Sequence, residues 1–97
     1  MPQLIFTDEK VMYERECILF KARYGSEEVS CGVTTYALQY RDPDLPTEGL
    51  VPSERFLESF EKHQLEIHQA VRRKFDRGEF EPQGDVKVMV HRKDLRR

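Results

Sequence analysis

Residues 53–77 read SERFLESFEKHQLEIHQAVRRKFDR, and this stretch has the spacing of a single amphipathic helix. At ~100° per residue, its apolar side chains fall on one narrow face. Ser53 and Gly78 mark the two ends, because a serine hydroxyl accepts a hydrogen bond from the first turn and a glycine adopts the left-handed backbone that closes the last turn. The apolar face has Phe56, Phe60, Ile67 and Val71 at its centre, with Leu57, Gln64 and Phe75 on one border and His63 and Ala70 on the other.

The charges of this predicted helix follow the order that the backbone dipole favours. Glutamates occupy its first half, and basic residues fill its last turns. This order stabilises a helix and specifies no reaction. A helix of 25 residues is ~38 Å long and must bury its apolar face against another layer of the protein.

The length and charge of the chain limit what it can form and bind. A chain of 97 residues is predicted to form one domain, residues 1–97. It buries roughly 60–65% of the surface that the unfolded chain exposes, which is enough for one core and not for two. The formal charge of −2 comes from 16 basic and 18 acidic residues. This balance gives no global field that attracts DNA or a polycation, so any such binding must be local.

Three stretches before residue 34 predict strands. From Cys17 to Tyr24, apolar and polar side chains alternate with a period of two, and Glu28 to Val33 repeat the pattern, which together predict a hairpin. The apolar run Leu4-Ile5-Phe6 predicts a short first strand or, equally, a packed terminal arm. The mostly polar residues 8–16 are predicted to form a loop or wide turn.

The two cysteines are predicted to be reduced. With a two-residue turn at Gly25-Ser26, Phe20 faces Cys31, so Cys17 points to the opposite face of the hairpin from Cys31. A four-residue loop over 25–28 keeps the same parity. Cys31 lies between two valines and fits the role of a small buried hydrophobe. Without a CxxC or paired-histidine spacing, the two cysteines make a weak case for zinc.

A short helix and a proline-rich loop are predicted to follow the hairpin. Thr34 or Thr35 offers an N-cap oxygen for a helix through about Arg41. Asp42-Pro43 ends this helix, because the residue before a proline avoids the helical region. Residues 42–52 then form a Pro-rich loop. The expected inward-facing residues are Ala37 and Leu38 with Tyr36 or Tyr40 in the helix, and Leu45, Leu50 and Val51 in the loop.

The end of the chain completes the predicted fold. Residues 78–85 are predicted to form a turn region anchored by Phe80, and the alternation of Val86, Val88 and Val90 predicts a last strand. The order of these elements predicts an α+β fold, with a small antiparallel sheet of about four strands covered on one face by one long and one short helix. The strands are too few and too local for a doubly wound parallel sheet.

A set of residues spread over nearly the whole chain is informative when taken in order: Val29-Ser30-Cys31-Gly32-Val33-Thr34, Ala37-Leu38, Phe56, Phe60, His63, Ile67, Ala70, Gly78 and the stretch from Val86 to Asp94-Leu95. With these residues the chain resembles a family of small bacterial proteins, domain of unknown function family 1488. The resemblance implies an α+β domain in a bacterial cytoplasm. It implies no activity, so it carries no catalytic residue over to this chain.

The sequence predicts no catalytic residue, no cofactor and no metal site. His63 and His68 lie ~140° apart around the helix, so they cannot chelate one metal as an i, i+4 pair does. We expect His63 to pack by its carbon edge and His91 to be solvated. The glycines occur singly and form no phosphate-binding loop. The serines lack a nucleophile context, because Ser26 lies in a turn, Ser53 caps a helix, Ser30 faces outward and Ser59 sits on a polar helix flank.

The sequence contains one candidate binding site, a cluster of basic residues that could bind phosphate groups. It forms a positive patch if the last strand runs beside the C-terminal half of the long helix, and such a patch binds phosphates with a salt-dependent affinity. Against this, the helix also displays glutamates, and no aromatic residue is interleaved with the cluster. The alternative is a solvated charged face with a basic tail at 92–97 that frays. The candidate residues are Arg72, Arg73, Arg77, Arg92, Lys93, Arg96 and Arg97, with Lys74 and His91 nearby.

These observations leave three functions open. The first is a non-enzymatic binding or accessory module that binds a protein partner or a second copy of the chain. The second is a weak, non-specific nucleic-acid binder that uses the basic C-terminal end, and the third is an enzyme with a site assembled between subunits. No run approaches the ~18–20 apolar residues of a membrane span, and the N-terminus lacks the basic and apolar regions of a leader. We therefore predict a cytoplasmic protein that does not bind membranes.

Overall fold

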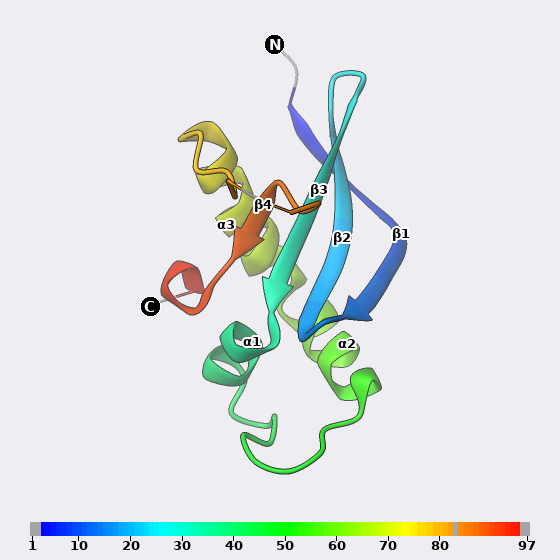
Figure 1. Cartoon of the computed structure of the whole chain (residues 1–97), viewed down its shortest axis with the longest axis vertical. Coiled ribbons are helices and arrows are strands. Elements are labelled where there is room, and N and C mark those ends of the chain that lie inside the picture. The colour runs from blue at the N-terminus through cyan, green and yellow to red at the C-terminus, as the bar shows by residue number, and fades with distance from the viewer. Residues whose placement is uncertain (1–2, 83, 96–97) are drawn as a thin grey trace.

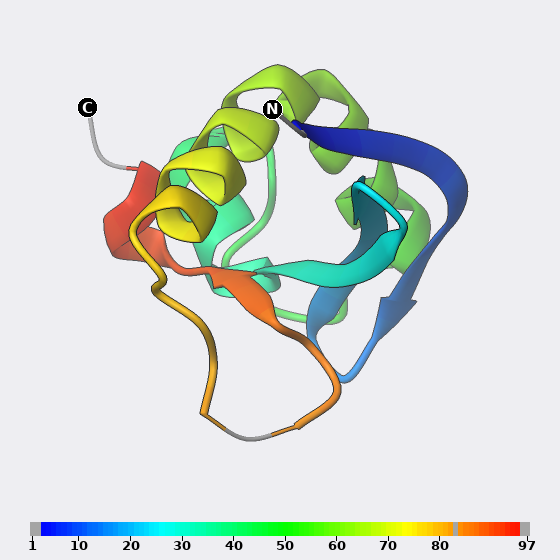
Figure 2. The same cartoon turned by 90° about the horizontal axis from the view of Figure 1, so that it is seen from above.

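Helices lie against a four-stranded sheet of order β1-β2-β3-β4 in the computed structural model, which describes residues 3–82 and 84–95 (Figure 1). Helices α2 and α3 cross one face of the sheet, and α1 lies at the end where β3 finishes (Figures 1 and 2). The predicted α+β class is confirmed. The elements are β1 (Leu4–Glu14), β2 (Cys17–Tyr24), β3 (Glu27–Thr34), α1 (Thr35–Arg41), α2 (Ser53–Lys62), α3 (Gln64–Asp76), β4 (Val88–Val90) and the 3-10 helix η1 (Arg92–Leu95).

The hairpin of β2 and β3 has the register that a two-residue turn at Gly25-Ser26 dictates. Phe20 pairs with Cys31, and Cys17 pairs with Thr34. Gly25 has a φ of 64°, which glycine adopts at little steric cost. The two cysteines point to opposite faces and are free, as predicted. Burial raises the pKa of Cys31 to about 12.

Strand β1 is much longer than predicted. The expectation of a strand at 4–6 and a loop at 8–16 is wrong, because β1 runs from Leu4 to Glu14. Its pairing with β2 shifts register between Thr7 and Met12, so residues 8–11 lie opposite the single residue Phe20. A bulge of this kind interrupts the period-2 alternation on which the prediction of a strand depends.

Strand β4 runs parallel to β3, which corrects the prediction of a wholly antiparallel sheet. Its three residues pair with Cys31–Val33, and the N–H of Lys87 donates to the carbonyl of Ser30 at 2.9 Å. Between the two strands the chain passes through α1, α2 and α3. A helical crossover returns the chain to the end at which β3 started, so the next strand runs in the same direction. Val86 lies outside the strand.

The predicted helix over 53–77 is divided at His63 into α2 and α3, which corrects the prediction of one helix. His63 has a φ of −108° and a ψ of 16°, outside the helical range. The carbonyl of Ser59 accepts hydrogen bonds from both the backbone N–H and the Nδ1 of His63, each at 3.0 Å. A side chain that enters the i→i−4 ladder bends a helix. The apolar spacing continues through the break, so the pattern alone does not reveal it.

The two ends of this helix pair differ from each other. Ser53 does not cap α2, contrary to the prediction, because Pro52 occupies the N-cap position and no side chain bonds to the first turn. At the other end, Gly78 has a φ of 70°. The N–H groups of Gly78 and Glu79 donate to carbonyls three and five residues back, which is a Schellman motif. The predicted stop at Gly78 is confirmed.

Helix α1 turns its two tyrosines to solvent. The Oγ1 of Thr34 accepts from the N–H of Ala37 at 3.0 Å, as predicted for an N-cap, and Ala37 and Leu38 are fully buried. Tyr36 and Tyr40 are 60% and 46% exposed, so the prediction that one of them faces inward is wrong. Because Ala37 and Leu38 both point to the core, helical spacing places both tyrosines on the opposite side.

The proline-rich loop is held by only two of its three predicted anchors. Leu45 is buried and Val51 packs against the core, as predicted. Leu50 is fully exposed, which corrects its assignment as an anchor. It follows Gly49, whose φ of 81° marks a turn of the loop.

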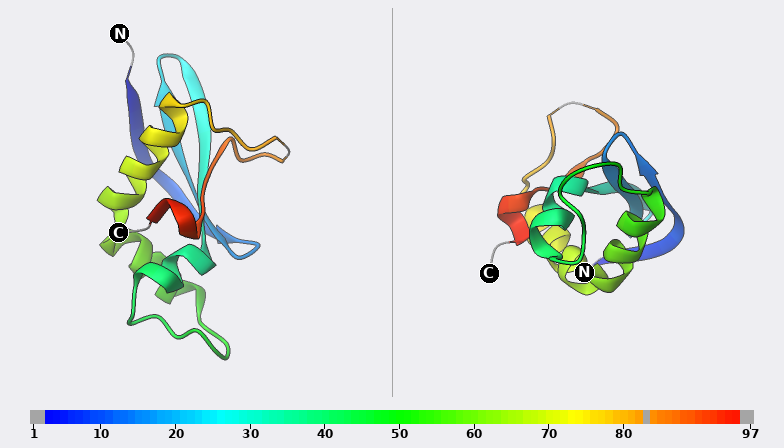
Figure 3. Two further views of the ribbon diagram at one scale, coloured as in Figure 1. Left: turned by 90° about the vertical axis from the view of Figure 1, so that its left-hand side faces the viewer. Right: turned by 90° about the horizontal axis from the view of Figure 1, so that it is seen from below.

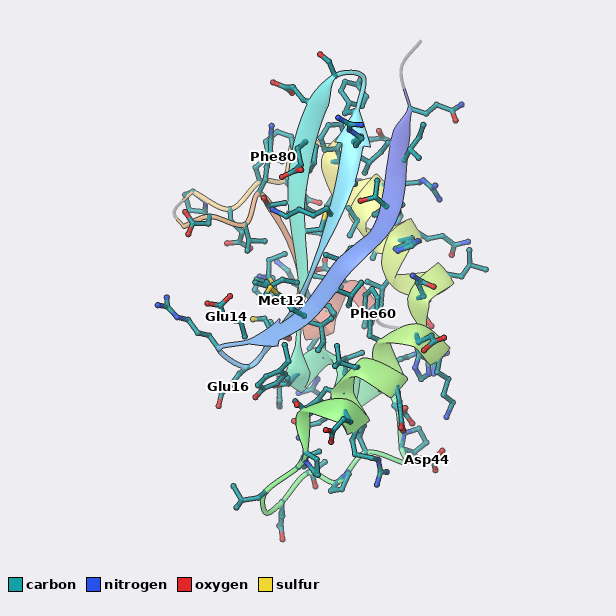
Figure 4. All side chains as sticks on the ribbon, turned by 90° about the vertical axis from the view of Figure 1, so that its right-hand side faces the viewer. Met12, Glu14, Glu16, Asp44, Phe60 and Phe80 are labelled. Atoms are coloured by element: carbon teal, nitrogen blue, oxygen red, sulfur yellow. The ribbon has the colours of Figure 1, made fainter. Side chains whose placement is uncertain are left out.

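The core lies between the sheet and the apolar faces of α2 and α3. Phe60 lies between α2 and the sheet (Figure 4), and its ring centroid is 4.9 Å from that of Phe20. The predicted apolar face of the long helix is therefore confirmed. The buried apolar residues are Leu4, Ile18, Phe20, Ala22, Val29, Cys31, Val33, Ala37, Leu38, Leu45, Phe56, Phe60, Ile67, Ala70, Val71, Val88, Val90 and Leu95.

Replacing Phe60 by Ala is expected to lower the free energy of unfolding by about 3–5 kcal/mol, the range for truncating a buried phenylalanine. Urea denaturation measures this change. Leu65→Ala, at a helix position that is 70% exposed, is the control and is expected to change the free energy by less than about 0.5 kcal/mol. A loss below about 1 kcal/mol for Phe60→Ala would show that α2 is not packed through this face.

Candidate functional site

The basic residues predicted to form one patch lie on different sides of α3. The guanidinium carbon of Arg72 lies 5.1 Å from the ring centroid of Phe6 on β1. Arg92 belongs to η1 and contacts α1 instead. The structure therefore does not gather Arg72 and Arg92 on one positive surface. Of the other candidates, Arg77 and Lys93 are exposed, and Arg96 and Arg97 lie outside the described residues.

Two further residues of the predicted basic cluster, Lys74 and Arg73, hold η1 against α3. The Nζ of Lys74 lies 2.9 Å from the Oδ2 of Asp94, and the Nη2 of Arg73 donates to the Asp94 carbonyl at 3.3 Å. The N–H of His91 donates to the same carboxylate at 2.8 Å. Burial raises the pKa of Asp94, but the bonds from His91 and Lys74 outweigh burial and leave the pKa below its ordinary value. Within the predicted basic tail, residues 92–95 thus form η1, with Leu95 buried.

Tyr36, Tyr40 and Arg92 form an exposed group that we name the tyrosine cluster. The Nη1 of Arg92 donates to the hydroxyl of Tyr36 at 2.8 Å. Its guanidinium carbon lies 4.3 Å from the ring centroid of Tyr40 and 5.5 Å from that of Tyr36. A guanidinium over an aromatic face is attracted by the ring quadrupole. The expectation that no aromatic accompanies the basic end is therefore wrong at Arg92.

Sequence reasoning missed the tyrosine cluster because its members are far apart in the chain. Arg92 and Tyr36 are 56 positions apart. The available signal was the i, i+4 spacing of Tyr36 and Tyr40, which places two aromatic rings on one face of any helix that contains them. Nothing in the spacing of Arg92 indicates that it reaches this face.

Tyr36 also lines an open hollow of about 420 Å³ between the β1–β2 turn, α1 and the proline-rich loop. Tyr13, Val51 and Phe56 contribute apolar surface to it, and the rings of Tyr13 and Phe56 are stacked with centroids 5.7 Å apart. The fully exposed Leu50 also borders the hollow. Because the hollow and the tyrosine cluster share Tyr36, they form one continuous surface at the α1 end of the domain.

A second hollow of about 540 Å³ lies beside the helix break. Two of its basic lining residues already have acidic partners, and a third, Arg73, donates to a backbone carbonyl. The Nε of Arg41 lies 2.9 Å from both carboxylate oxygens of Glu66, and the Nζ of Lys62 lies 3.1 Å from the Oδ2 of Asp44. An anion entering this hollow must compete with these carboxylates. The hollow is therefore a weaker candidate for ligand binding than the surface that contains Tyr36.

Asp42 carries a buried carboxylate, with 3% exposure of the residue. It accepts hydrogen bonds from the hydroxyl of Ser59 at 2.9 Å and from the N–H of Asp44 at 3.0 Å. The Nζ of Lys62 and the Nδ1 of His63 lie 3.5 Å and 3.9 Å from its oxygens. Burial raises the pKa of Asp42, but the bonds from Ser59 and Asp44 and the charge of Lys62 outweigh burial and leave the pKa below its ordinary value.

Ser59, His63 and Asp42 are the residue types of a catalytic triad, but their hydrogen bonds are not those of one. In a triad the histidine accepts the serine proton, and the carboxylate orients the histidine. Here Ser59 donates directly to Asp42, while the Nδ1 of His63 bonds to the Ser59 carbonyl. Ser59 is 3% exposed, which corrects its prediction as a residue of a polar flank. The three side chains act as a structural network.

The other two histidines have partners of their own. The ring of His68 stacks on that of Phe6, with centroids 3.8 Å apart. The Nε2 of His91 lies 2.9 Å from a carboxylate oxygen of Glu81. The prediction of a solvated His91 is therefore corrected, because its ring has a side-chain partner. Within residues 3–82 and 84–95, no group of three or more His, Cys, Asp or Glu side chains is arranged to hold a metal ion.

Comparisons with known proteins identify one family. A family model described as "Protein of unknown function (DUF1488)" matches residues 4–88. A crystal structure at 1.60 Å of a protein of unknown function from the DUF1488 family, from Shewanella loihica PV-4, superposes with a TM-score of 0.76 at 21% identity over 90% of each chain, which shows the same fold. No curated protein matches the chain. In the described ranges, every helix is too short or too polar to cross a membrane.

Asp42→Asn is expected to lower the free energy of unfolding at neutral pH by about 1–3 kcal/mol, the cost of buried donors left without an acceptor. It is also expected to reduce the loss of stability in acid. The pKa of Asp42 is lower in the folded chain than its unfolded value of ~3.9, so its contribution is present above that value and is lost as the pH falls through the folded pKa.

Urea denaturation at a series of pH values measures both effects of Asp42→Asn. Asp85→Asn, at an exposed position, is the control and is expected to behave like the unchanged chain. Acid dependence of equal size in the Asp42→Asn variant and the unchanged chain would contradict the role assigned to this carboxylate.

Proposed function

The chain belongs to the DUF1488 family, and we propose that it is a non-enzymatic binding module of the bacterial cytoplasm whose partner is another protein. The tyrosine cluster is the single observation that carries this proposal. Two exposed tyrosines from α1 and an arginine from η1 are held together at the α1 end of the domain. The core does not require either tyrosine, since Ala37 and Leu38 supply the buried face of α1.

The residue types of the tyrosine cluster are those that contribute most to protein interfaces. Tyrosine and arginine are enriched among the residues whose truncation weakens protein complexes most. A tyrosine brings a large apolar ring and a hydroxyl, so it binds at the boundary between apolar and polar surface. Arg92 is already fixed by Tyr36 and Tyr40. A group that is ordered before binding loses less conformational entropy when the partner arrives.

The hollow beside Tyr36 adds an apolar recess to this surface. Tyr13, Val51 and Phe56 contribute to its lining, and Leu50 projects fully exposed beside it. A partner that inserts one apolar side chain there also covers Tyr36. Arg92 then offers its guanidinium to a carboxylate or carbonyl of the same partner. The surface thus fits a protein segment with an apolar residue next to an acidic or polar one.

The state of the candidate nucleophiles supports a non-enzymatic role. The hydroxyl of Ser59 is buried and donates to Asp42. Burial raises the pKa of Cys31 to about 12, and burial together with the charge of Glu16 raises the pKa of Cys17. Both thiols are therefore held in the protonated form, which is the poorer nucleophile. An enzyme with a site assembled between subunits would have to rely on other residues.

Replacing Tyr36 and Tyr40 by Ala is expected to abolish binding of the protein partner while the chain still folds. The tagged chain and its variants are used to capture proteins from a lysate of the source cells, and bound proteins are quantified by mass spectrometry. We expect proteins held through the tyrosine cluster to fall by about tenfold or more in the double variant, as for truncated interface hot spots.

The control for this experiment is Phe80→Ala, which removes a partly exposed aromatic ring away from α1. Thermal melting of all variants establishes that they fold. If the double tyrosine variant captures the same proteins in the same amounts as the unchanged chain, the tyrosine cluster is not the binding surface.

The tyrosine cluster also favours a second candidate function, weak and non-specific binding of nucleic acid. Aromatic rings beside a cation stack on bases without regard to sequence. Lys93 is exposed next to Arg92, and neither has an acidic partner among the described residues. The net charge of −2 opposes such binding. We therefore rank nucleic acid below a protein partner.

Replacing Arg92, Lys93, Arg96 and Arg97 by Ser is the test of this second candidate. If nucleic acid binds there, we expect dissociation constants of ~10⁻⁴–10⁻⁶ M for the unchanged chain, and a weaker, less salt-dependent interaction for the variant, because fewer counterions are released. Arg15→Ser with Arg23→Ser is the control. Nanomolar sequence-selective binding, or binding unchanged by the four substitutions, would contradict this candidate, and no binding at low salt would remove it.

A further inference from the structure

One face of the sheet is turned away from α2 and α3, and no helix or strand of the described ranges covers it (Figure 3). We name it the outer face. Along β2, Ile18 and Phe20 are buried in the core. Because successive side chains of a strand alternate, Leu19 and Lys21 lie on the outer face. The contact of Lys21 with Ser30 on β3 places that serine on the same side.

An apolar row crosses the outer face at right angles to the strands. Met12 pairs with Leu19, Leu19 with Gly32, and Gly32 with Met89, so each of the four strands contributes one residue. A Cβ built on Gly32 would lie 3.0 Å from the Sδ of Met89 and 3.2 Å from the Cδ2 of Leu19, so these two side chains close over the glycine. Met12 remains 49% exposed. Methionine side chains adapt readily to an opposing surface.

Charged side chains of opposite sign flank the apolar row. Glu14 lies two residues from the row toward the β1–β2 turn, and Lys21 lies two residues from it toward the β2–β3 turn. At ~3.4 Å per residue, each lies ~7 Å from the row, on opposite sides. Arg23 extends the basic side. Lys21 pairs with Glu28 at 3.3 Å, whereas Glu14 and Arg23 have no ion-pair partner among the described residues.

We propose that the outer face binds the outer face of a second copy of this chain, through a twofold axis that runs along the apolar row. Rotation about this axis keeps the position along the row and reverses the direction along the strands. The two rows then stack on each other with β1 over β1, and Glu14 of each copy lies level with Lys21 of the other, one strand (~4.8 Å) to the side. An axis parallel to the strands would instead bring the two basic sides together, which is unfavourable. The charges therefore select the first axis.

The size of the outer face predicts a dimer of modest affinity. Three strands of about eight residues and the three residues of β4, at ~4.8 Å between strands and ~3.4 Å per residue, present at most about 440 Å², compared with ~800 Å² per partner in a standard interface. The β1–β2 turn and the segment with Phe80 project on the same side and extend this area; in Figure 4, Met12 lies between them. We expect the dimer to be in equilibrium with the monomer.

Sedimentation equilibrium over a range of concentrations tests the dimer directly. The apparent mass is expected to rise from 11.6 kDa toward about twice that value. Leu19→Asp places a charge in the centre of the row and is expected to weaken the dimer by about tenfold or more. Leu65→Asp is the matched control, since Leu65 is an exposed leucine on α3. It is expected to leave the dissociation constant unchanged.

A charge-swap experiment tests the axis and does not depend on the apolar variant. Glu14→Lys alone sets lysine against Lys21 in both contacts of the dimer, and Lys21→Glu alone sets two glutamates against each other. Each variant is expected to dimerise about tenfold more weakly. An equimolar mixture of the two variants forms a heterodimer in which both contacts between positions 14 and 21 are again between opposite charges, so the mixture is expected to dimerise more tightly than either variant alone.

Three results would overturn the proposal. The first is a monomeric mass at all concentrations up to ~1 mM. The second is a dimer that Leu19→Asp weakens no more than Leu65→Asp does, which would place the interface elsewhere. The third is a mixture of the Glu14→Lys and Lys21→Glu variants that dimerises no better than either variant alone, which would exclude the proposed axis.

Discussion

The buried carboxylate of Asp42 fixes the relative positions of three parts of the chain. Its backbone N–H donates to Leu38 and ends α1, while its side chain accepts from Asp44 in the proline-rich loop and from Ser59 in α2. A charge removed from water is tolerated only when hydrogen bonds and an opposite charge compensate it, and these partners together with Lys62 do so. The carbonyl of Ser59 also binds the ring of His63. The same network therefore ends one helix, holds the loop and sets the break between the next two helices.

The break between α2 and α3 allows a helical layer to follow a twisted sheet. Neighbouring strands rotate by roughly 20–25° relative to one another, so one straight helix would leave part of the sheet uncovered. Instead, α2 contacts β1 and β2, while α3 contacts β4 and reaches the start of β1 through His68 and Arg72. The crossover then returns the chain parallel to β3, so that β4 finishes at the same end of the sheet as β3. This direction brings η1 beside α1. Arg92 reaches Tyr36 and Tyr40 because β4 is parallel, and an antiparallel β4 would carry η1 to the opposite end.

Much of the fold follows from local patterns in the sequence, and the tyrosine cluster does not. The turn at Gly25-Ser26, the N-cap at Thr34 and the stop at Gly78 each depend on a few neighbouring residues, and their predictions are confirmed. The bulge of β1 and the direction of β4 depend on contacts between distant segments, for which a spacing pattern carries no information. The break at His63 depends on hydrogen bonds to the Ser59 carbonyl and on the nearby carboxylate of Asp42, which the apolar spacing does not reflect. The same limit applies to Arg92, whose partners belong to another helix. The basic patch was predicted from the positions of basic residues along the chain, and these positions do not reveal that Arg72 contacts β1 whereas Arg92 contacts α1.

The tyrosine cluster and the outer face of the sheet are separate surfaces, and the proposed twofold axis determines how they combine. The tyrosine cluster lies at the end of the sheet where β3 finishes (Figure 1), and the axis crosses β2 and β3 at Leu19 and Gly32, two residues from that end. Reversal of the strand direction then carries the tyrosine cluster of the second copy to the opposite end of the dimer. Both copies of Tyr36, Tyr40 and Arg92 stay accessible, but they point away from each other. One small partner cannot contact both clusters, so binding of a compact partner to the dimer gains no avidity. The dimer is instead suited to bridging two partner molecules, or two distant segments of one large partner.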